Sequence, residues 1–265
     1  MLKYLRLGFV GGGRLILCTP WMSRFASHPE RYPLVEERYP KVRGLVQFAC
    51  RITKTKYIVR GEENLLNDTN VVYAPNHQSN MDPLSLIALS ETPLTFVSKT
   101  EALKFPFVGN IVKALDGVFI DRSDIRQEVQ AMNQVSLLLQ SQTRLSICIF
   151  PEGTRSKDPE HTLASFKPGA LKAAYTSNKP IIPVAIYGTF RVLDKKCRMK
   201  EFPVQVSFLK PHMPSEFEKI NTVQMAKIIY NEVKTEVDRL RENDRKLVEE
   251  YRYLKKKGSY YFKGV

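Results

Sequence analysis

The run VVYAPNHQSNMDP, residues 71–83, decides the fold class of this 265-residue chain. Its first four residues form an apolar stretch that predicts a buried β-strand. A turn of polar residues follows, and Pro83 suits the first turn of a helix. A strand that stops at a turn and continues into a helix is where α/β proteins hold their chemistry. The run therefore predicts an α/β fold with a functional site at this turn.

The same turn carries His77 and Asp82, five residues apart. On one continuous helix, five steps of about 100° would leave the two side chains about 140° apart, too far round to touch. If His77 lies in the turn and Asp82 in the first helical turn, the imidazole can reach the carboxylate. A histidine oriented by a carboxylate is a general base for a hydroxyl or water. The alternative is that Asp82 only caps the helix and His77 is a polar turn residue.

A second apolar run also ends at a polar turn. LSICIF, residues 145–150, predicts a strand that stops at PEGTRS, residues 151–156. Proline followed by glycine two positions later makes a tight turn, which displays Glu152, Thr154 and Arg155 at the strand end. The alternative is an ordinary polar turn without a chemical role.

Two more runs complete the pattern. GVFIDR, residues 117–122, is a short apolar strand that ends in Asp121 and Arg122, for which a surface ion pair of little energetic value is the alternative. IIPVAI, residues 181–186, predicts a buried strand whose Pro183 requires a sheet edge or a bulge.

In this order and with these gaps, the four runs resemble the four motifs of the glycerolipid acyltransferases, most closely those that acylate 1-acyl-sn-glycerol-3-phosphate. The resemblance covers about residues 55–215, and four ordered motifs are far more specific than one. It implies that a fatty acyl group passes from an acyl thioester, carried by acyl carrier protein or coenzyme A, to the sn-2 hydroxyl of lysophosphatidic acid. The product would be phosphatidic acid, and no cofactor is expected, because the acyl thioester is itself a co-substrate.

The chemistry of acyl transfer fits the first motif. An aliphatic alcohol is about as weak an acid as water, so the base must take its proton while the oxygen attacks the thioester. His77 is the candidate base, and Asp82 would fix its tautomer and stabilise the imidazolium. Such catalysis typically contributes about 10²- to 10⁴-fold. Direct transfer needs no serine acyl-enzyme, and the sequence has no Gly-x-Ser-x-Gly elbow.

In the family, the second and third motifs are assigned to glycerol-phosphate binding. Arginine suits bidentate phosphate recognition, and Gly153 would let the backbone approach the ligand. Glu152 would orient an arginine or a substrate hydroxyl. Lys99 is a weaker phosphate candidate, and a solvated surface lysine is its alternative. The matching motif positions are Asp121, Arg122, Glu152, Gly153, Thr154 and Arg155.

The charge distribution suits an enzyme that works at a membrane surface. The net charge is +14, and the first 60 residues hold 12 Lys and Arg against three Asp and Glu. The last 25 residues hold eight basic and four acidic residues. Basic ends attract anionic lipid by about 1 kcal/mol per charge near the surface, and they also suit an acidic acyl carrier protein. Nucleic acid competes as a partner for a basic chain, but no nucleic-acid motif is present and we expect none to bind.

The N-terminal residues 1–55 are expected to form a basic amphipathic segment that lies in the membrane interface. Its charge-free stretches, Leu7–Gly13 and Leu15–Ser23, are divided by Arg14, and each is shorter than the 20 or so apolar residues that a span needs. The broken apolar region also argues against a cleaved signal peptide. The alternative is an amphipathic helix packed on the domain. We therefore expect a peripheral or monotopic protein on the cytoplasmic face of the cell membrane.

The remaining pattern predicts a mixed central sheet flanked by helices. Residues 56–215 would form the acyltransferase domain, with strands also at 94–98 and 204–208 and helices at about 124–140 and 166–177. The first of these helices is expected to pack on the core through an apolar face of Ile125, Val129, Met132, Val135 and Leu139. Residues 216–265 would form a helical extension, with one or two breaks, that packs on the domain. The four cysteines are scattered, which suits a reducing compartment and argues against zinc or disulfides. No third ligand accompanies His77 and Asp82, so no metal site is predicted.

Other functions stay open at this stage. A hydrolase could use the same His/Asp base on water, with the phosphate site holding a lipid. A non-catalytic module could bind anionic membranes through its basic ends, although this leaves the four ordered motifs unexplained. Within the resemblance, the acceptor could also be another lysolipid or glycerol-3-phosphate itself.

Overall fold

The computed structural model describes residues 12–121, 125–141, 144–160, 162–194, 196–197, 199, 201–217 and 219–253. Within these ranges one mixed sheet has the strand order β1-β7-β6-β2-β5-β3-β4. The strands are β1 (Thr55–Arg60), β2 (Val72–Pro75), β3 (Leu94–Lys99), β4 (Val118–Ile120), β5 (Ser146–Cys148), β6 (Ile181–Tyr187) and β7 (Phe202–Phe208). The strands from β6 to β4 run parallel, whereas β7 is antiparallel to β6 and β1 is parallel to β7. The predicted α/β class with a mixed sheet is confirmed.

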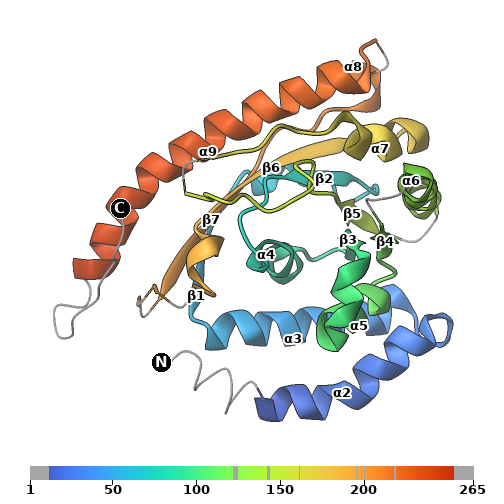
Figure 1. Cartoon of the computed structure of the whole chain (residues 1–265), viewed down its shortest axis with the longest axis horizontal. Helices are drawn as coiled ribbons and strands as arrows, with labels where there is room; N and C mark the ends of the chain where they lie inside the picture. Colours follow the sequence, from blue (N-terminus) through green and yellow to red (C-terminus); the bar gives the residue numbers. More distant parts are fainter. Residues whose placement is uncertain are drawn as a thin grey trace.

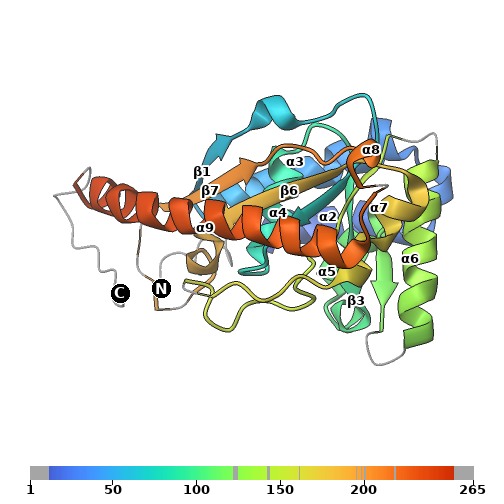
Figure 2. The ribbon, with the colours of Figure 1, turned by 90° about the horizontal axis from the view of Figure 1, so that it is seen from above.

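Helices cover both faces of the sheet (Figures 1 and 2). One layer consists of α2 (Gly12–Ser27), α3 (Tyr39–Ile52), α4 (Met81–Leu89) and α5 (Pro106–Ala114). The other consists of α6 (Ile125–Gln140), α7 (Lys172–Ser177) and α9 (Thr222–Tyr253). Short helices connect these elements: η2 (Pro29–Arg31), η3 (Leu34–Arg38), η4 (Glu62–Asn64), η5 (Thr100–Lys104), η6 (Pro168–Leu171), η7 (Thr189–Arg191) and α8 (Pro214–Phe217).

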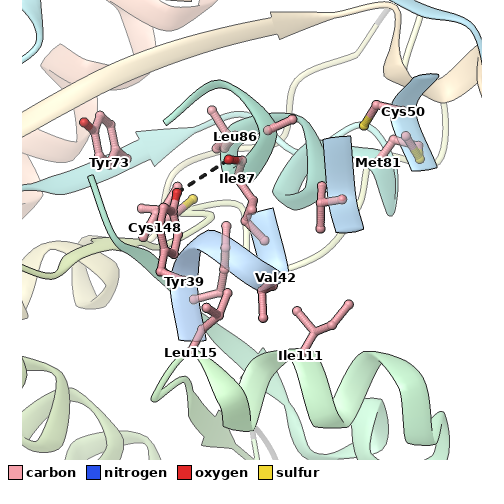
Figure 3. Packing of buried hydrophobic residues seen from close by; sticks show 14 of the residues in the cluster. Tyr39, Val42, Cys50, Tyr73, Met81, Leu86, Ile87, Ile111, Leu115 and Cys148 are labelled. Carbon is pink, nitrogen blue, oxygen red and sulfur yellow. Dashed lines mark hydrogen bonds between the residues drawn. The ribbon is translucent and has the colours of Figure 1, made fainter. Parts of the chain in front are cut away.

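The apolar run that opens the first motif is buried on both faces. Val71 and Tyr73 pack into the core beneath α3, α4 and α5, whereas Val72 and Ala74 pack toward α6, α7 and α9. Successive side chains of a strand point to opposite faces, so a central strand needs apolar residues at every position. Figure 3 shows the first of these cores, where residues of α3, α4 and α5 meet residues of β2 and β5.

The N-terminal segment belongs to the same core. Met22 and Phe25 of α2 are buried, and Arg38 at the start of α3 is tied to Asp116 by two hydrogen bonds of 2.6 and 2.8 Å. The alternative of a helix packed on the domain therefore holds for α2, although Leu17 stays 77% exposed. Among the described helices, none combines the length and apolarity that crossing a membrane requires. Membrane association of residues 1–55 stays a prediction, and residues 1–11 lie outside the described ranges.

Pro183 corrects one expectation. It lies in β6, which pairs with β2 on one side and β7 on the other, so it is not on an edge strand. Its carbonyl accepts the N–H of Leu209, one residue beyond the end of β7. Pro183 therefore faces β7 just beyond the last residue pair of the β6–β7 ladder, where its missing N–H breaks no hydrogen bond inside the ladder.

The helical predictions hold with two refinements. The helix at 124–140 is present as α6, but Val129 is 47% exposed and Ala131 takes its place in the core. Residues 166–177 split into η6 and α7, with Pro168 opening η6. The C-terminal extension consists of α8 and a 32-residue α9, which packs on the core through Met225, Ile229 and Val233.

Candidate functional site

Three turns meet at one edge of the sheet. The strands β6, β2 and β5 are neighbours and run parallel, so their carboxyl ends lie side by side. The first motif follows β2, the third follows β5, and Gly188 and Thr189 follow β6. Ligands of open α/β sheets bind outside the carboxyl ends of the strands, which makes this edge the candidate active site.

His77 and Asp82 touch, as the strand–turn–helix interpretation predicts. The His77 Nδ1 lies 2.7 Å from Asp82 Oδ2, with Asp82 and Pro83 in the first turn of α4. The carboxylate is completely buried, whereas the His77 side chain is 17% exposed. With Nδ1 bonded to the carboxylate, Nε2 remains for a substrate proton, which is the arrangement of a general base.

Asp82 is held by several further donors. Its Oδ2 accepts the backbone N–H groups of Gln78 at 2.6 Å and Ser79 at 2.8 Å. Its Oδ1 accepts the hydroxyl of Thr189, which lies in η7. A buried carboxylate is costly unless it is hydrogen-bonded, and here both oxygens have donors. The carboxylate is therefore fixed in place before any substrate arrives.

The first and third motifs are joined around His77. Its ring stacks on Phe150, with centroids 4.0 Å apart and an interplanar angle of 25°. Its backbone N–H donates to Glu152 Oε1 at 2.5 Å, and its carbonyl accepts the N–H of Ser156 at 2.9 Å. The position of the His77 turn thus depends on residues 73 to 79 positions later in the chain.

Glu152 is buried and bonded to the backbone. The second carboxylate oxygen, Oε2, accepts the N–H of Ala164 at 2.9 Å, and the residue is 3% exposed. Burial raises the pKa of Glu152 to about 7, opposed by the N–H groups of His77 and Ala164 and assisted by the negative charge of Asp82. In this geometry Glu152 orients the His77 turn. Its predicted contact with an arginine or a substrate hydroxyl stays a prediction.

An open cavity of about 430 Å³ lies beside the His77–Asp82 pair, here called the dyad, between the first and third motifs. Gly153 takes a left-handed φ of 72° in the third-motif turn, which a side chain would disfavour. The turn places Thr154 and Arg155 on the cavity wall. The full lining is Gln78, Ser79, Asn80, Thr154, Arg155, Ser156, Lys157, Pro159, Phe190, Leu193 and Asp194.

Lys157 is a cation of this cavity that the motif pattern does not single out. It lies two positions after Arg155 and is exposed. Asp194, which follows η7 in the chain, adds one negative charge to the cavity wall. The signal that could have found Lys157 is its place directly after the third-motif turn, residues 151–156.

Lys99 and Asp121 lie farther along the same sheet edge. Lys99 ends β3 and pairs with Ile120, so Asp121 follows on the neighbouring strand. These strands are two and three places from β2, about 10 and 14 Å at the usual strand spacing. Neither residue lines the cavity beside His77. Arg122 lies outside the described residues, and its predicted phosphate contact stays a prediction.

No metal-binding cluster of three or more His, Cys, Asp or Glu side chains occurs in the part of the chain that the structure describes. Cys18, Cys50 and Cys148 are buried cysteines outside any disulfide, and Cys197 is half-buried.

Comparison with known sequences gives consistent matches. A family model described as Acyltransferase matches residues 56–187. The chain is 36% identical over 224 residues to a probable 1-acyl-sn-glycerol-3-phosphate acyltransferase of Mycoplasma pneumoniae, covering 80% of this chain and 82% of that protein. It is 32% identical over 148 residues to the 1-acyl-sn-glycerol-3-phosphate acyltransferase of Borreliella burgdorferi, covering 56% and 58%.

The fold has a solved counterpart. The crystal structure of the 1-acyl-sn-glycerophosphate (LPA) acyltransferase PlsC from Thermotoga maritima superposes with a TM-score of 0.70 at 24% identity. The match covers 90% of this chain and 95% of that one, so it extends beyond the motif region.

Proposed function

The chain belongs to the 1-acyl-sn-glycerol-3-phosphate acyltransferase family, and we propose on that premise that His77 is the general base of its acyl transfer. The reaction moves a fatty acyl group from an acyl thioester to the sn-2 hydroxyl of lysophosphatidic acid, forming phosphatidic acid in phospholipid biosynthesis. The observation that carries the proposal is the 2.7 Å contact between His77 Nδ1 and the buried Asp82 carboxylate.

His77 takes part in both proton transfers of the reaction, and Asp82 supports it. His77 Nε2 accepts the hydroxyl proton while the sn-2 oxygen attacks the thioester carbonyl carbon. The carbon–sulfur bond then breaks, and the departing sulfur takes the proton from the imidazolium. Asp82 holds the ring by Nδ1 and stabilises its positive charge between the two proton transfers. Acyl carrier protein and coenzyme A both present such a thioester, and we propose a carrier of this chemistry without choosing between them.

The acceptor phosphate would bind in the cavity beside the dyad. Arg155 offers the planar fork of donors that matches phosphate oxygens, and Lys157 adds a second positive charge on the same wall. Thr154 supplies a hydroxyl there. We propose that Glu152 acts indirectly, by holding the His77 turn, because both of its oxygens accept backbone N–H groups.

Peripheral association with an anionic membrane surface, on the cytoplasmic face, completes the proposal. Leu103, Phe105 and Val108 follow the carboxyl end of β3 and are 43%, 66% and 47% exposed. They lie in η5 and at the start of α5, the helix against which α2 packs. Lys104 is exposed among them. Apolar side chains mixed with a cation suit the lipid interface from which lysophosphatidic acid must come.

The experiment is a product assay on the full chain. Membranes that carry the protein receive lysophosphatidic acid and a radiolabelled acyl thioester, with either coenzyme A or acyl carrier protein as the carrier. Labelled phosphatidic acid supports the proposal. Free fatty acid as the main product would indicate a hydrolase, and transfer only to other lysolipids would change the acceptor.

A further inference from the structure

Thr189 contacts the catalytic dyad from a part of the chain that none of the four motifs includes. It is completely buried in η7, directly after β6. Its hydroxyl donates to Asp82 Oδ1, on the side of the carboxylate away from His77. The other oxygen, Oδ2, is occupied by His77 and two backbone N–H groups. Thr189 is therefore the side-chain donor to the oxygen that the His77 turn leaves open.

We propose that Thr189 is a positioning residue for the acyl transfer, acting through Asp82 on His77. The proposal rests on the proposed role of His77 as the base. A carboxylate can rotate about its last torsion, and rotation would carry Oδ2 away from His77 Nδ1. The Thr189 hydroxyl fixes that torsion from the far side. It also satisfies an oxygen that would otherwise be buried without a donor.

The backbone that carries Thr189 is anchored on its N-terminal side. Gly188 has a φ of 100°, and a Cβ at this position would lie 2.6 Å from the carbonyl oxygen of Pro203. Its N–H donates to Gln78 Oε1 at 3.0 Å, which ties the turn after β6 to the His77 turn. The glycine therefore lets the backbone before Thr189 pass close to β7, which helps to fix the position of Thr189.

A buried ion pair anchors the other side. Arg191, two residues after Thr189, is 2% exposed and pairs with Asp244 of α9. Its guanidinium lies 4.9 Å from the ring centroid of Phe190 and 5.6 Å from that of Tyr187. Helix α9 runs along the sheet in Figures 1 and 2, so the C-terminal extension supports η7. Both Thr189 and α9 lie beyond residues 56–187, the stretch that the family model matches.

The test compares two buried threonines in the full-length protein. Thr189→Val keeps the side-chain volume and removes the hydroxyl that bonds Asp82. Thr95→Val is the matched control, because Thr95 is completely buried in β3 and its hydroxyl makes no hydrogen bond. We expect Thr189→Val to lower kcat about 10- to 100-fold, with KM for lysophosphatidic acid within about twofold. Thr189→Ser should recover kcat to within about threefold of wild type, and Thr95→Val should match wild type.

The outcomes separate the two proposals. A kcat for Thr189→Val equal to that of Thr95→Val, in an enzyme that His77→Ala inactivates, overturns the role of Thr189 only. Full activity in His77→Ala would remove the base itself. If Thr189→Val lowers the Tm so far that it unfolds in the assay, Thr189→Ser and Thr189→Ala take its place. Equal kcat values for serine and alanine then overturn the proposal, whereas a serine-specific recovery supports it.

Discussion

Arg155 is the exposed cation on which the proposed phosphate site depends most. It lines the cavity beside the His77 turn and reaches it from the third motif. A charge-assisted hydrogen bond to phosphate contributes about 1.5–3 kcal/mol, so Arg155→Ala should lower kcat/KM for lysophosphatidic acid about 10- to 100-fold. The loss should appear mainly in KM, because the arginine does not contact the dyad. Steady-state kinetics with varied acceptor concentration measures it.

Arg144 provides the matched control for this substitution. It is exposed and precedes β5, at the end of the strand opposite the third motif. Arg144→Ala should leave both constants within about twofold of wild type. Equal effects of the two substitutions would mean that general surface charge, and no phosphate site at Arg155, accounts for the acceptor affinity.

Glu152 makes a pH-dependent contribution to stability. Its pKa is raised in the folded protein from the ordinary 4.5 to about 7, chiefly by burial. The folded state therefore holds the proton more tightly than the unfolded state between these two values. The contribution is fully present below about pH 4.5 and is lost as the pH rises to about 7, a change on the order of 3 kcal/mol.

Glu152→Gln isolates this contribution, since glutamine does not titrate. The free energy of unfolding of wild type, relative to the variant, should fall as the pH rises from 5 to 8. Chemical denaturation of both proteins across that range measures the difference. A difference that is flat or that grows with pH would contradict the raised pKa of the carboxyl group.

Whether the sequence predicts a contact between two side chains depends on how far apart the two residues lie along the chain. His77 and Asp82 are only five positions apart, and the local pattern places the start of a helix between them. Their contact can therefore be predicted from the sequence. Thr189 lies 107 positions from Asp82, and its contact exists because β6 and β2 are neighbours in the sheet. A Gly-Thr pair directly after a buried strand was the available signal. Nothing in the local pattern tells which side chain it will meet.

Among the elements, η7 begins at a tightly constrained glycine, Gly188. Gly188 takes a left-handed φ and approaches the carbonyl of Pro203 too closely for a side chain. Gly188→Ala should lower stability by about 1–3 kcal/mol and lower kcat at least about tenfold, because Thr189 would be displaced from Asp82. Thermal unfolding and kinetics of the purified variant give both numbers.

Gly44→Ala is the control for Gly188→Ala. It lies inside α3, and a Cβ there meets no atom within 4 Å. Gly44→Ala should leave kcat unchanged and raise stability by about 0.5–1 kcal/mol, since alanine favours the helix. A Gly188→Ala variant with wild-type kcat would separate η7 from the function of the dyad.

Strands with continuous apolar runs were predictable from the sequence, whereas a partly buried edge strand was not. The strands β2 and β6 come from continuous apolar runs, and both are buried along their length. The edge strand β1 was not predicted, because most of its residues are only partly buried and its sequence alternates weakly. The predicted face of α6 was wrong at Val129, which is 47% exposed, since helical spacing alone does not fix the edges of the buried face.

For the whole molecule, Val108 and Val129 allow a direct test of membrane orientation. Both are 47% exposed, but Val108 lies on α5 and Val129 on α6, in the opposite helical layer. If the α2–α5 layer faces the lipid, Val108→Glu should weaken binding to anionic vesicles about 3- to 10-fold, and Val129→Glu should not. Co-sedimentation of the full-length protein with vesicles measures the binding.

Ionic strength gives the second readout of that test. With a net charge of +14, wild-type binding to anionic vesicles should fall as salt rises and should be weak on neutral vesicles. Equal effects of Val108→Glu and Val129→Glu would contradict the proposed orientation. Binding that salt does not change would contradict the electrostatic contribution.

His77→Ala removes the group that we propose takes the proton of the acceptor hydroxyl. His28→Ala is the control, because His28 precedes η2 in the N-terminal segment and its side chain is 51% exposed. The measurement is phosphatidic acid formed from lysophosphatidic acid and a labelled acyl thioester, with both variants confirmed as folded by thermal unfolding. We expect a loss of at least about 100-fold for His77→Ala and none for His28→Ala. Equal rates for His77→Ala and wild type would show that His77 is not the base.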